Sequence, residues 1–268
     1  MKEFERIWHR WLRRPYRLHI TEDMGQGDPV VLLHGIASSG AAWRPLSVLL
    51  VAQKRRVIAP DLLGFGDSPK PQDVDYSVET HARAVLAALR RQRVRGPITL
   101  VAHSMGCLVA VHIAARYPRR IKHVILYEPP LLVDMPEFRT HARRRKQYFA
   151  FFEYLMKHPE LALAQDRALL RMLRKISGFA LDEEMWTAFE RSLRNTIMGQ
   201  QAYKDLHAIS IPTDIVYGRF DIAVTRADVR NMFRHNKNIT LHMTNQQHDI
   251  TIQASRYLAR LLETRKTP

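Results

Sequence analysis

The strongest constraint on the fold lies between Gly96 and Arg116, where an apolar run meets a helical pattern at a serine. The run Ile98–Ala102 predicts a buried strand that is entered through a Gly-Pro pair. From about Met105 onward, apolar residues recur at helical spacing until a Tyr-Pro pair ends the pattern. The chain therefore passes from strand through a sharp turn into a helix, with Ser104 at the junction.

A serine at such a junction has its hydroxyl at the carboxyl end of a strand, in front of a helix amino terminus that favours developing negative charge. The tight turn requires small residues two positions before and after the serine. Ala102 and Gly106 occupy these positions, so a methyl group stands at the first of them, where glycine is usual. We interpret Ser104 as a candidate nucleophile.

Length and composition indicate a soluble globular chain. Its 268 residues are enough for one large α/β domain with an insertion, and 46% hydrophobic with 25% charged residues is ordinary for such a domain. The single cysteine, Cys107, excludes an intrachain disulfide and argues against a thiolate metal site. We interpret Cys107 as a core residue of a protein in a reducing compartment.

Basic residues are in large excess, with 42 Lys and Arg against 26 Asp and Glu and a formal net charge of +16. Two basic clusters, at 90–95 and 116–122, each follow a predicted helix and precede a predicted strand. In a parallel sheet both clusters lie at the edge opposite the nucleophile. We interpret them as a solvated face and expect no specific nucleic-acid partner, because no nucleic-acid motif accompanies them.

The first residues combine charges with apolar positions and contain no apolar stretch of signal-peptide length. Residues 2–14 are typical of a short basic amphipathic helix, which either docks on the protein itself or makes a weak contact with an anionic membrane surface. No stretch approaches the roughly 18 apolar residues of a membrane span. The expected location is cytoplasmic.

Strand and helix patterns alternate along most of the chain, which predicts a mostly parallel sheet flanked by helices. The pattern stops between 131 and 205, where helical, aromatic-rich sequence replaces it. Further strands are predicted at Val30–Leu33, Arg56–Ala59, Ile121–Leu126, Pro212–Gly218 and Asn238–Met243, and helices at Trp43–Leu50, Tyr76–Arg90 and Ile250–Leu262.

The turn Ala102-His-Ser-Met-Gly106, together with His34-Gly-Ile36 after the strand that ends at Leu33, resembles the α/β-hydrolase superfamily over about residues 16–262. The resemblance implies an α/β-hydrolase fold with an inserted helical cap. It divides the chain into an amino-terminal basic helix (1–14), a core (15–130 and 206–268) and a cap (131–205).

The same resemblance assigns a catalytic triad in the chain order that this fold uses. Ser104 is the nucleophile, Asp221 is the acid shortly after the strand ending at Gly218, and His248 is the base on the loop after the last strand. Glu128 remains an alternative acid, because some relatives place the acid after the strand that follows the elbow helix.

The backbone N–H groups of Ile36 and Met105 are the implied oxyanion hole, and His34 is interpreted as a structural residue of its loop. The resemblance implies no metal and no organic cofactor.

These assignments predict a serine esterase that cleaves a carboxylic ester or lactone of a small to medium apolar acyl substrate. One alternative is a carbon–carbon hydrolase of ring-fission products, whose anionic substrates require an arginine such as Arg139, Arg171 or Arg174. Another is a small-molecule receptor without turnover. The substrate, its chain length and the oligomeric state stay open.

Overall fold

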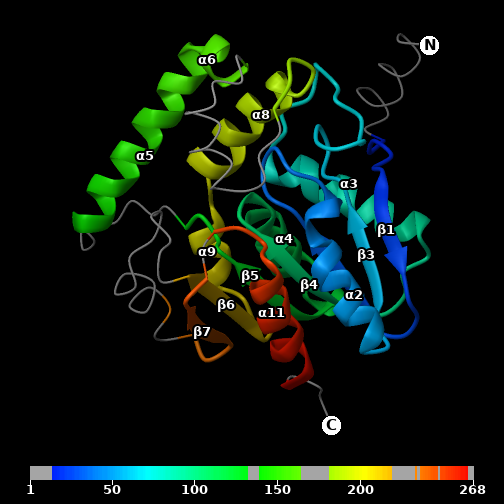
Figure 1. Ribbon diagram of the computed structural model, residues 1–268. Helices are drawn as coiled ribbons and strands as arrows, with labels where there is room; N and C mark the ends of the chain where they lie inside the picture. Colours follow the sequence, from blue (N-terminus) through cyan, green and yellow to red (C-terminus); the bar gives the residue numbers. More distant parts are fainter. Residues whose placement is uncertain are drawn as a thin grey trace.

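The computed structural model describes residues 14–131, 139–163, 181–218, 233, 236–246 and 248–264. In these residues seven strands form one sheet in the order β1-β3-β2-β4-β5-β6-β7 (Figure 1). All neighbours pair in parallel except β1, which pairs antiparallel with β3 at one edge. The strands are β1 (Ile20–Met24), β2 (Pro29–Leu33), β3 (Arg56–Pro60), β4 (Ile98–His103), β5 (Ile121–Tyr127), β6 (Thr213–Gly218) and β7 (Ile239–Thr244).

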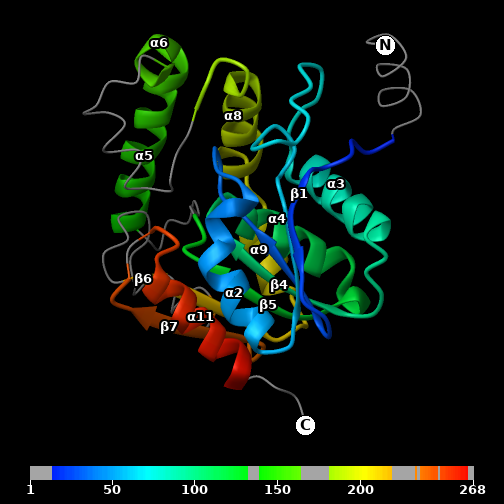
Figure 2. The same cartoon turned by 45° about the vertical axis from the view of Figure 1, so that its right-hand side comes forward.

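Helices cover both faces of this sheet. One face carries α3 (Val78–Arg91), α4 (Met105–Arg116) and α9 (Ala202–His207), and the other carries α2 (Arg44–Ala52) and α11 (Ile252–Thr264) (Figures 1 and 2). Two short 3₁₀ turns, η2 (Gly40–Trp43) and η3 (Pro118–Arg120), connect helices and strands.

Alternation along the strands separates two apolar cores. In β2, Val31 and Leu33 belong to the cluster under α3 and α4, whereas Val30 and Leu32 belong to the cluster under α2 and α11. Successive side chains of a strand point to opposite faces, so a continuous apolar run is required where both faces are covered. This explains why these strands are uniformly apolar in the sequence.

The predicted strands and helices outside the cap are confirmed to within about two residues at most ends. One strand was missed. β1 contains two acidic residues among five and lies at the sheet edge, where it lacks the apolar run that marks the buried strands.

The described parts of 131–205 contain no strand. They form α5 (Arg139–Lys157), α6 (Pro159–Leu163), α8 (Trp186–Ser192), the π-helical turn η4 (Leu193–Met198) and the first residues of α9. Figures 1 and 2 show α5, α6 and α8 beyond the end of the sheet toward which β3 runs, which is the carboxyl end of the parallel strands. The boundaries of the core and cap remain predictions, and residues 1–13 lie outside the described part.

Among the described residues, none of the helices has the length and apolar character needed to cross a membrane.

Candidate active site

Ser104 occupies a sharp turn between β4 and α4. Its backbone has φ 50° and ψ −123°, a left-handed conformation that costs a non-glycine residue energy and recurs at functional sites. The Ser104 N–H donates to the carbonyl of Tyr127 on β5 (3.1 Å), and Cys107 N–H donates back to the Ser104 carbonyl (2.9 Å). The turn is therefore fixed from both sides, and the serine stands before the first turn of α4.

Gly106 allows α4 to approach the loop after β2. A Cβ atom on Gly106 would lie 2.5 Å from the His34 carbonyl oxygen and 2.7 Å from that of Leu33, so the position has no room for a side chain. Ala102 is fully buried in the cluster under α4, so the turn accommodates its methyl group. The small residues predicted around the serine are thus accounted for individually.

His34 fixes the loop that carries Ile36. Its Nδ1–H donates to the Gly35 carbonyl (2.7 Å), and its Nε2 accepts from the Leu62 N–H (2.8 Å). Complete burial lowers the pKa of His34, which keeps the ring neutral. The prediction of a structural role is confirmed.

The two predicted oxyanion donors lie on the loop after β2 and on the helix α4, which Gly106 allows to approach each other. Ile36 follows the His34-Gly35 pair, and Met105 is the first residue of α4, where a helix N–H has no intrahelical partner. Both residues are buried. Their roles as donors remain predictions.

His248 lies beside the elbow because the residue before the nucleophile holds it there. The His103 Nε2–H donates to the His248 carbonyl (2.8 Å), and the two imidazole rings are 4.9 Å apart at their centroids. A second anchor follows, since the Tyr127 hydroxyl donates to the Asp249 carbonyl (3.1 Å). The ends of β4 and β5 thereby fix the loop that carries the predicted base.

Sequence reasoning missed His103. The only available signal was its place directly before the serine, and a strand residue gives no indication of which distant loop its ring will contact. His103 is almost fully buried and also lies 5.7 Å from the Tyr127 ring and 6.4 Å from the Trp43 ring.

Asp221, the predicted acid, lies outside the described residues. The alternative acid, Glu128, is fully buried at the carboxyl end of β5 with φ 51°. Its Oε1 accepts the N–H of Gly218 at the end of β6 (2.5 Å). Glu128 therefore lies at the carboxyl edge of the sheet, beside the last residue of β6, and both acids stay in consideration.

Two residues that compete with the predicted acid and base, Asp214 and His242, are hydrogen-bonded to each other. Asp214 is fully buried on β6, where Oδ2 accepts from His123 (2.6 Å) and Oδ1 accepts from His242 on β7 (2.7 Å). The prediction that Asp214 and His242 are strand residues is confirmed.

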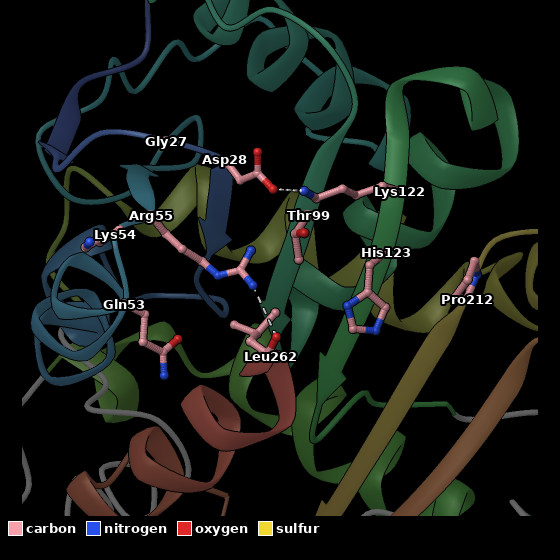
Figure 3. Close-up of a pocket in the computed structure, with 10 residues that line it drawn as sticks. All are labelled: Gly27, Asp28, Gln53, Lys54, Arg55, Thr99, Lys122, His123, Pro212 and Leu262. Atoms are coloured by element: carbon pink, nitrogen blue, oxygen red, sulfur yellow. Dashed lines mark hydrogen bonds and ion pairs between the residues drawn. The ribbon is translucent and has the colours of Figure 1, made fainter. Parts of the chain in front are cut away.

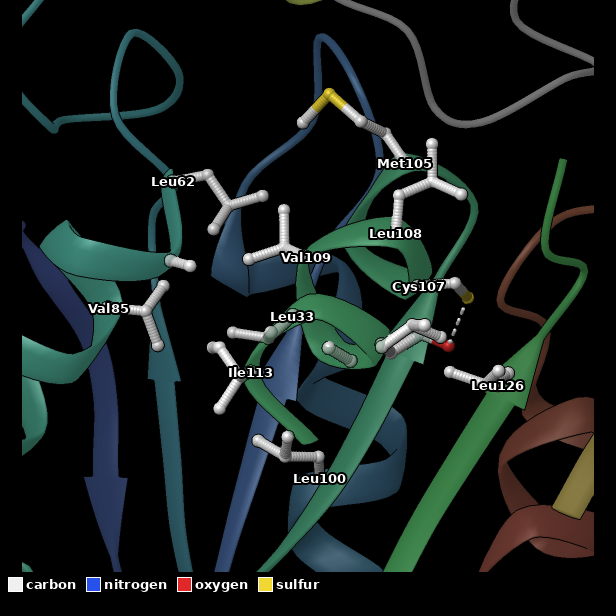
Figure 4. Packing of buried hydrophobic residues seen from close by; sticks show 14 of the residues in the cluster. Leu33, Leu62, Val85, Leu100, Met105, Cys107, Leu108, Val109, Ile113 and Leu126 are labelled. Atoms are coloured by element: carbon white, nitrogen blue, oxygen red, sulfur yellow. Dashed lines mark hydrogen bonds between the residues drawn. The ribbon is translucent and has the colours of Figure 1, made fainter. Parts of the chain in front are cut away.

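Cys107 is a core residue, as predicted. Its thiol is fully buried and donates to the Ala102 carbonyl (3.1 Å; Figure 4). Burial raises the pKa of this thiol well above its ordinary value, with a smaller contribution from the Glu128 charge. A thiol in this state is inert as a nucleophile.

One group in the described residues has metal-ligand atoms close together, namely His19, Asp61 and Asp67 within 4.8 Å. The Asp61 carboxylate already accepts hydrogen bonds from the Thr21 hydroxyl (2.6 Å) and from the N–H groups of Gly40 (2.7 Å) and Asp67 (2.8 Å). These bonds hold the Asp61 pKa below its ordinary value despite burial. The hydrogen bonds of Asp61 therefore stabilise the loop after β3.

The family model described as "alpha/beta hydrolase fold" matches residues 28–253. The chain belongs to the alpha/beta hydrolase family. This match covers the serine turn, the His34 loop and the loop of His248, so the family resemblance and the α/β-hydrolase fold are both confirmed.

Individual relatives agree on the fold and differ in chemistry. The chain is 37% identical over 109 residues to 2-hydroxy-6-oxo-2,4-heptadienoate hydrolase of Pseudomonas putida, a stretch that covers 39% of this chain and 38% of that protein. An esterase from Exiguobacterium antarcticum superimposes with a TM-score of 0.73 at 18% identity, covering 92% of this chain and 94% of the other. The enol-lactonase from Burkholderia xenovorans gives 0.67 at 21% identity, covering 92% and 95%.

The chain spans only 21% to 38% of the length of the curated relatives that it matches. The family model establishes the family, and the two structures establish the fold.

Proposed function

We propose that this protein is a serine esterase that cleaves a carboxylic ester or lactone through an acyl-enzyme. The observation that carries the proposal is the left-handed conformation of Ser104 at the amino end of α4, with His248 held beside the elbow by His103. Apolar side chains also gather beside the elbow, where Leu62, Met105 and Leu108 lie together at the top of the core (Figure 4). Such a wall suits an apolar acyl group.

In the proposed reaction, His248 accepts the Ser104 proton while Oγ attacks the ester carbonyl carbon. The carbonyl oxygen becomes an oxyanion that the Ile36 and Met105 N–H groups stabilise, each contributing about 3 kcal/mol to the lowering of the barrier. His248 then donates its proton to the departing alkoxide, which leaves as the alcohol. Water then attacks the acyl-enzyme through the same steps, with His248 accepting its proton, and the carboxylic acid is released. Asp221 orients His248 throughout.

The first experiment is labelling with a fluorophosphonate probe, followed by assays on p-nitrophenyl esters of increasing chain length. We expect the natural protein to label and turn over, and the Ser104→Ala variant to do neither. A protein that binds esters but is inert to both reagents would contradict the proposal and favour a receptor on the same fold.

The acid is tested by two isosteric variants. Asp221→Asn should lower kcat about 10⁴-fold, because His248 loses the group that fixes its tautomer and stabilises its cation. Glu128→Gln should retain most activity, because an amide oxygen can still accept the Gly218 N–H. The opposite result would make Glu128 the acid and leave the serine mechanism intact.

A second candidate is a carbon–carbon hydrolase, which the similarity to the Pseudomonas putida hydrolase favours. The discriminating assay follows the loss of the visible or near-ultraviolet absorbance of a 2-hydroxy-6-oxo-dienoate. A kcat/KM for this substrate above that for the best p-nitrophenyl ester would replace the esterase assignment.

A further inference from the structure

A cavity of about 720 Å³ opens at the amino-terminal edge of the sheet, on the face covered by α2 and α11. It lies between the turn before β2, the turn after α2, the first residues of β4 and β5, and the end of α11 (Figure 3). Ser104 is at the other end of β4, about 16 Å from Thr99 at ~3.3 Å per strand residue. The cavity is therefore separate from the candidate active site.

Basic side chains line this cavity. Lys54, Arg55 and Lys122 contribute three cations, and Asp28 is the one carboxylate among the lining residues. Asp28 pairs with Lys122 (2.5 Å), and its side chain is 67% exposed, so this pair lies at the mouth. The lining residues therefore carry three positive charges and one negative charge, which leaves a net charge of +2.

Arg55 is the central observation. The residue is only 8% exposed, yet its guanidinium makes one hydrogen bond to the described residues, from Nη2 to the Leu262 carbonyl (3.2 Å). Its Nε–H is buried and has no acceptor there. A buried guanidinium with so few acceptors is costly, since each buried donor without a partner loses its hydration.

The backbone around Arg55 is held in place. Arg55 N–H donates to the Leu50 carbonyl (3.1 Å), which closes the end of α2. Gly27 has φ 107° and packs so closely on the Lys54 carbonyl that a Cβ atom there would collide with it. The guanidinium is thus presented on a fixed turn, which lowers the entropic cost of binding.

The polar floor comes from two neighbouring strands. Thr99 and His123 are paired across β4 and β5 and both line the cavity. His123 Nε2 is committed to Asp214 (2.6 Å), so its ring is fixed in orientation. Figure 3 shows the Arg55 guanidinium between the Asp28–Lys122 pair and Leu262, with Thr99 and His123 on the side toward β5.

We propose that this cavity binds a small molecule through a dianionic phosphate group. A guanidinium presents donors in a fork that fits phosphate oxygens, lysine adds compact charge, and a dianion balances the excess of two cations. A carboxylate would leave one charge unmatched. The volume greatly exceeds that of a phosphate group, so the rest of a small phosphomonoester fits beside Thr99 and His123.

The test is calorimetric titration of the full-length protein with glycerol 3-phosphate and with inorganic phosphate, with acetate at equal ionic strength as reference. We expect one site that prefers either phosphate to acetate. Tighter binding of glycerol 3-phosphate would identify an ester as the ligand, and equal binding would identify free phosphate. Several weak sites that do not saturate would overturn the proposal.

Matched variants separate the cavity from the general positive charge. Lys122→Met and Arg55→Lys should each raise the Kd at least tenfold. Two control variants lie outside the cavity lining. Arg95→Met removes one charge from the same edge of the sheet, and Ser104→Ala alters the candidate nucleophile. The Kd of each control should stay within twofold of that of the natural protein. If Arg55→Lys does not fold, Lys54→Met with Lys122→Met decides the question.

A nucleic acid is the competing ligand for a basic face. Binding of a 12-nucleotide single strand that Arg95→Met and Lys122→Met weaken equally, with no saturable phosphomonoester site, would overturn the proposal and assign the whole edge to polyanions.

Discussion

The residues next to Ser104 in the sequence have more to do with assembling the site than the serine itself. His103 turns to one side and holds the His248 carbonyl, while Gly106 lets α4 approach the carbonyl of His34. The sequence motif predicted the serine and the need for small neighbours, because these follow from the geometry of the turn. It could not predict the His103 contact, which joins residues 145 apart.

His103→Phe should impair catalysis more than stability. The phenyl ring keeps the packing against Trp43 and Tyr127, and loss of the hydrogen bond to the His248 carbonyl should cost about 1 kcal/mol in the free energy of unfolding. Because the His248 loop loses an anchor, kcat for a p-nitrophenyl ester should fall about tenfold with little change in KM. His103→Gln restores a donor and should recover part of the loss; equal kcat in both variants and the natural protein would contradict this role.

Gly106→Ala should damage both stability and activity. The added methyl group meets the His34 and Leu33 carbonyl oxygens, and overpacking of this kind costs about 1–3 kcal/mol in the free energy of unfolding. The loop after β2, which carries the predicted oxyanion donor Ile36, must also move, so kcat should fall at temperatures where the variant is folded. Gly96→Ala is the control, since it has φ 75° but open space, and it should lose stability without loss of kcat; urea unfolding with ester assays tests both.

At the scale of elements, the sequence predicted the helices and strands whose burial demands apolar residues at regular positions. The strands β2 to β6 were predictable because burial on both sheet faces requires a continuous apolar run, and the helices α3 and α11 were predictable because burial of one helix face leaves a periodic apolar pattern. β1 was not predicted, because an edge strand tolerates charged residues and so lacks a continuous apolar run. The π turn η4 escaped because its i to i+5 bond, from the Gly199 N–H to the Arg194 carbonyl (3.0 Å), has no counterpart in residue spacing.

Asp214 joins three strands, so its substitution should act on stability alone. The carboxylate binds His123 on β5 and His242 on β7, and removing one partner from a buried cluster costs about 3–5 kcal/mol. We expect Asp214→Ala to lower the urea midpoint strongly, whereas kcat per folded molecule at low temperature stays near that of the natural protein. A selective loss of kcat with an unchanged midpoint would return Asp214 to the list of candidate acids.

Over the whole molecule, the sequence predicted that Ser104 lies at one edge of the sheet and the basic clusters at the opposite edge. It did not predict the cavity between the basic side chains. Arg55 is one of many arginines in the chain, and only the folded arrangement shows that it is buried beside Lys122 and Leu262. The turns after α2 and before β2 and the end of α11 meet there, and such a meeting leaves no local pattern. The predicted triad acid and the cap arginines Arg171 and Arg174 fall outside the described residues, as does the Arg139 side chain.

Stability of the whole molecule should depend on His81, which links α3 to Ser192 at the end of α8. The ring is fully buried, stacks on Phe65 (centroids 6.3 Å apart) and lies 3.1 Å from the Ser192 hydroxyl through Nε2. Burial lowers the pKa of His81 to about 3, with a smaller contribution from its coupling to His34. In the unfolded chain this pKa is about 6.5, so between these values only the unfolded state binds the proton.

Protonation therefore favours unfolding as the pH falls below about 6.5, and the contribution of His81 is fully present only above that pH. For His81 alone, the free energy of unfolding should drop by about 1.4 kcal/mol between pH 7.5 and 5.5. His34 adds to the loss in the same direction, since burial also lowers its pKa. The lowered pKa values of Asp28, Asp61 and Asp75 act only below about pH 4.

Urea unfolding at the two pH values measures this difference in the natural protein, in His81→Gln and in His207→Gln, whose histidine is exposed on α9. His81→Gln should reduce the pH dependence by about 1.4 kcal/mol whatever its own stability, because glutamine does not titrate. His207→Gln is the control for replacing a histidine at an exposed position. Equal pH dependence in all three proteins would mean that His81 takes up a proton without unfolding, and that the contact between α3 and Ser192 tolerates a charged ring.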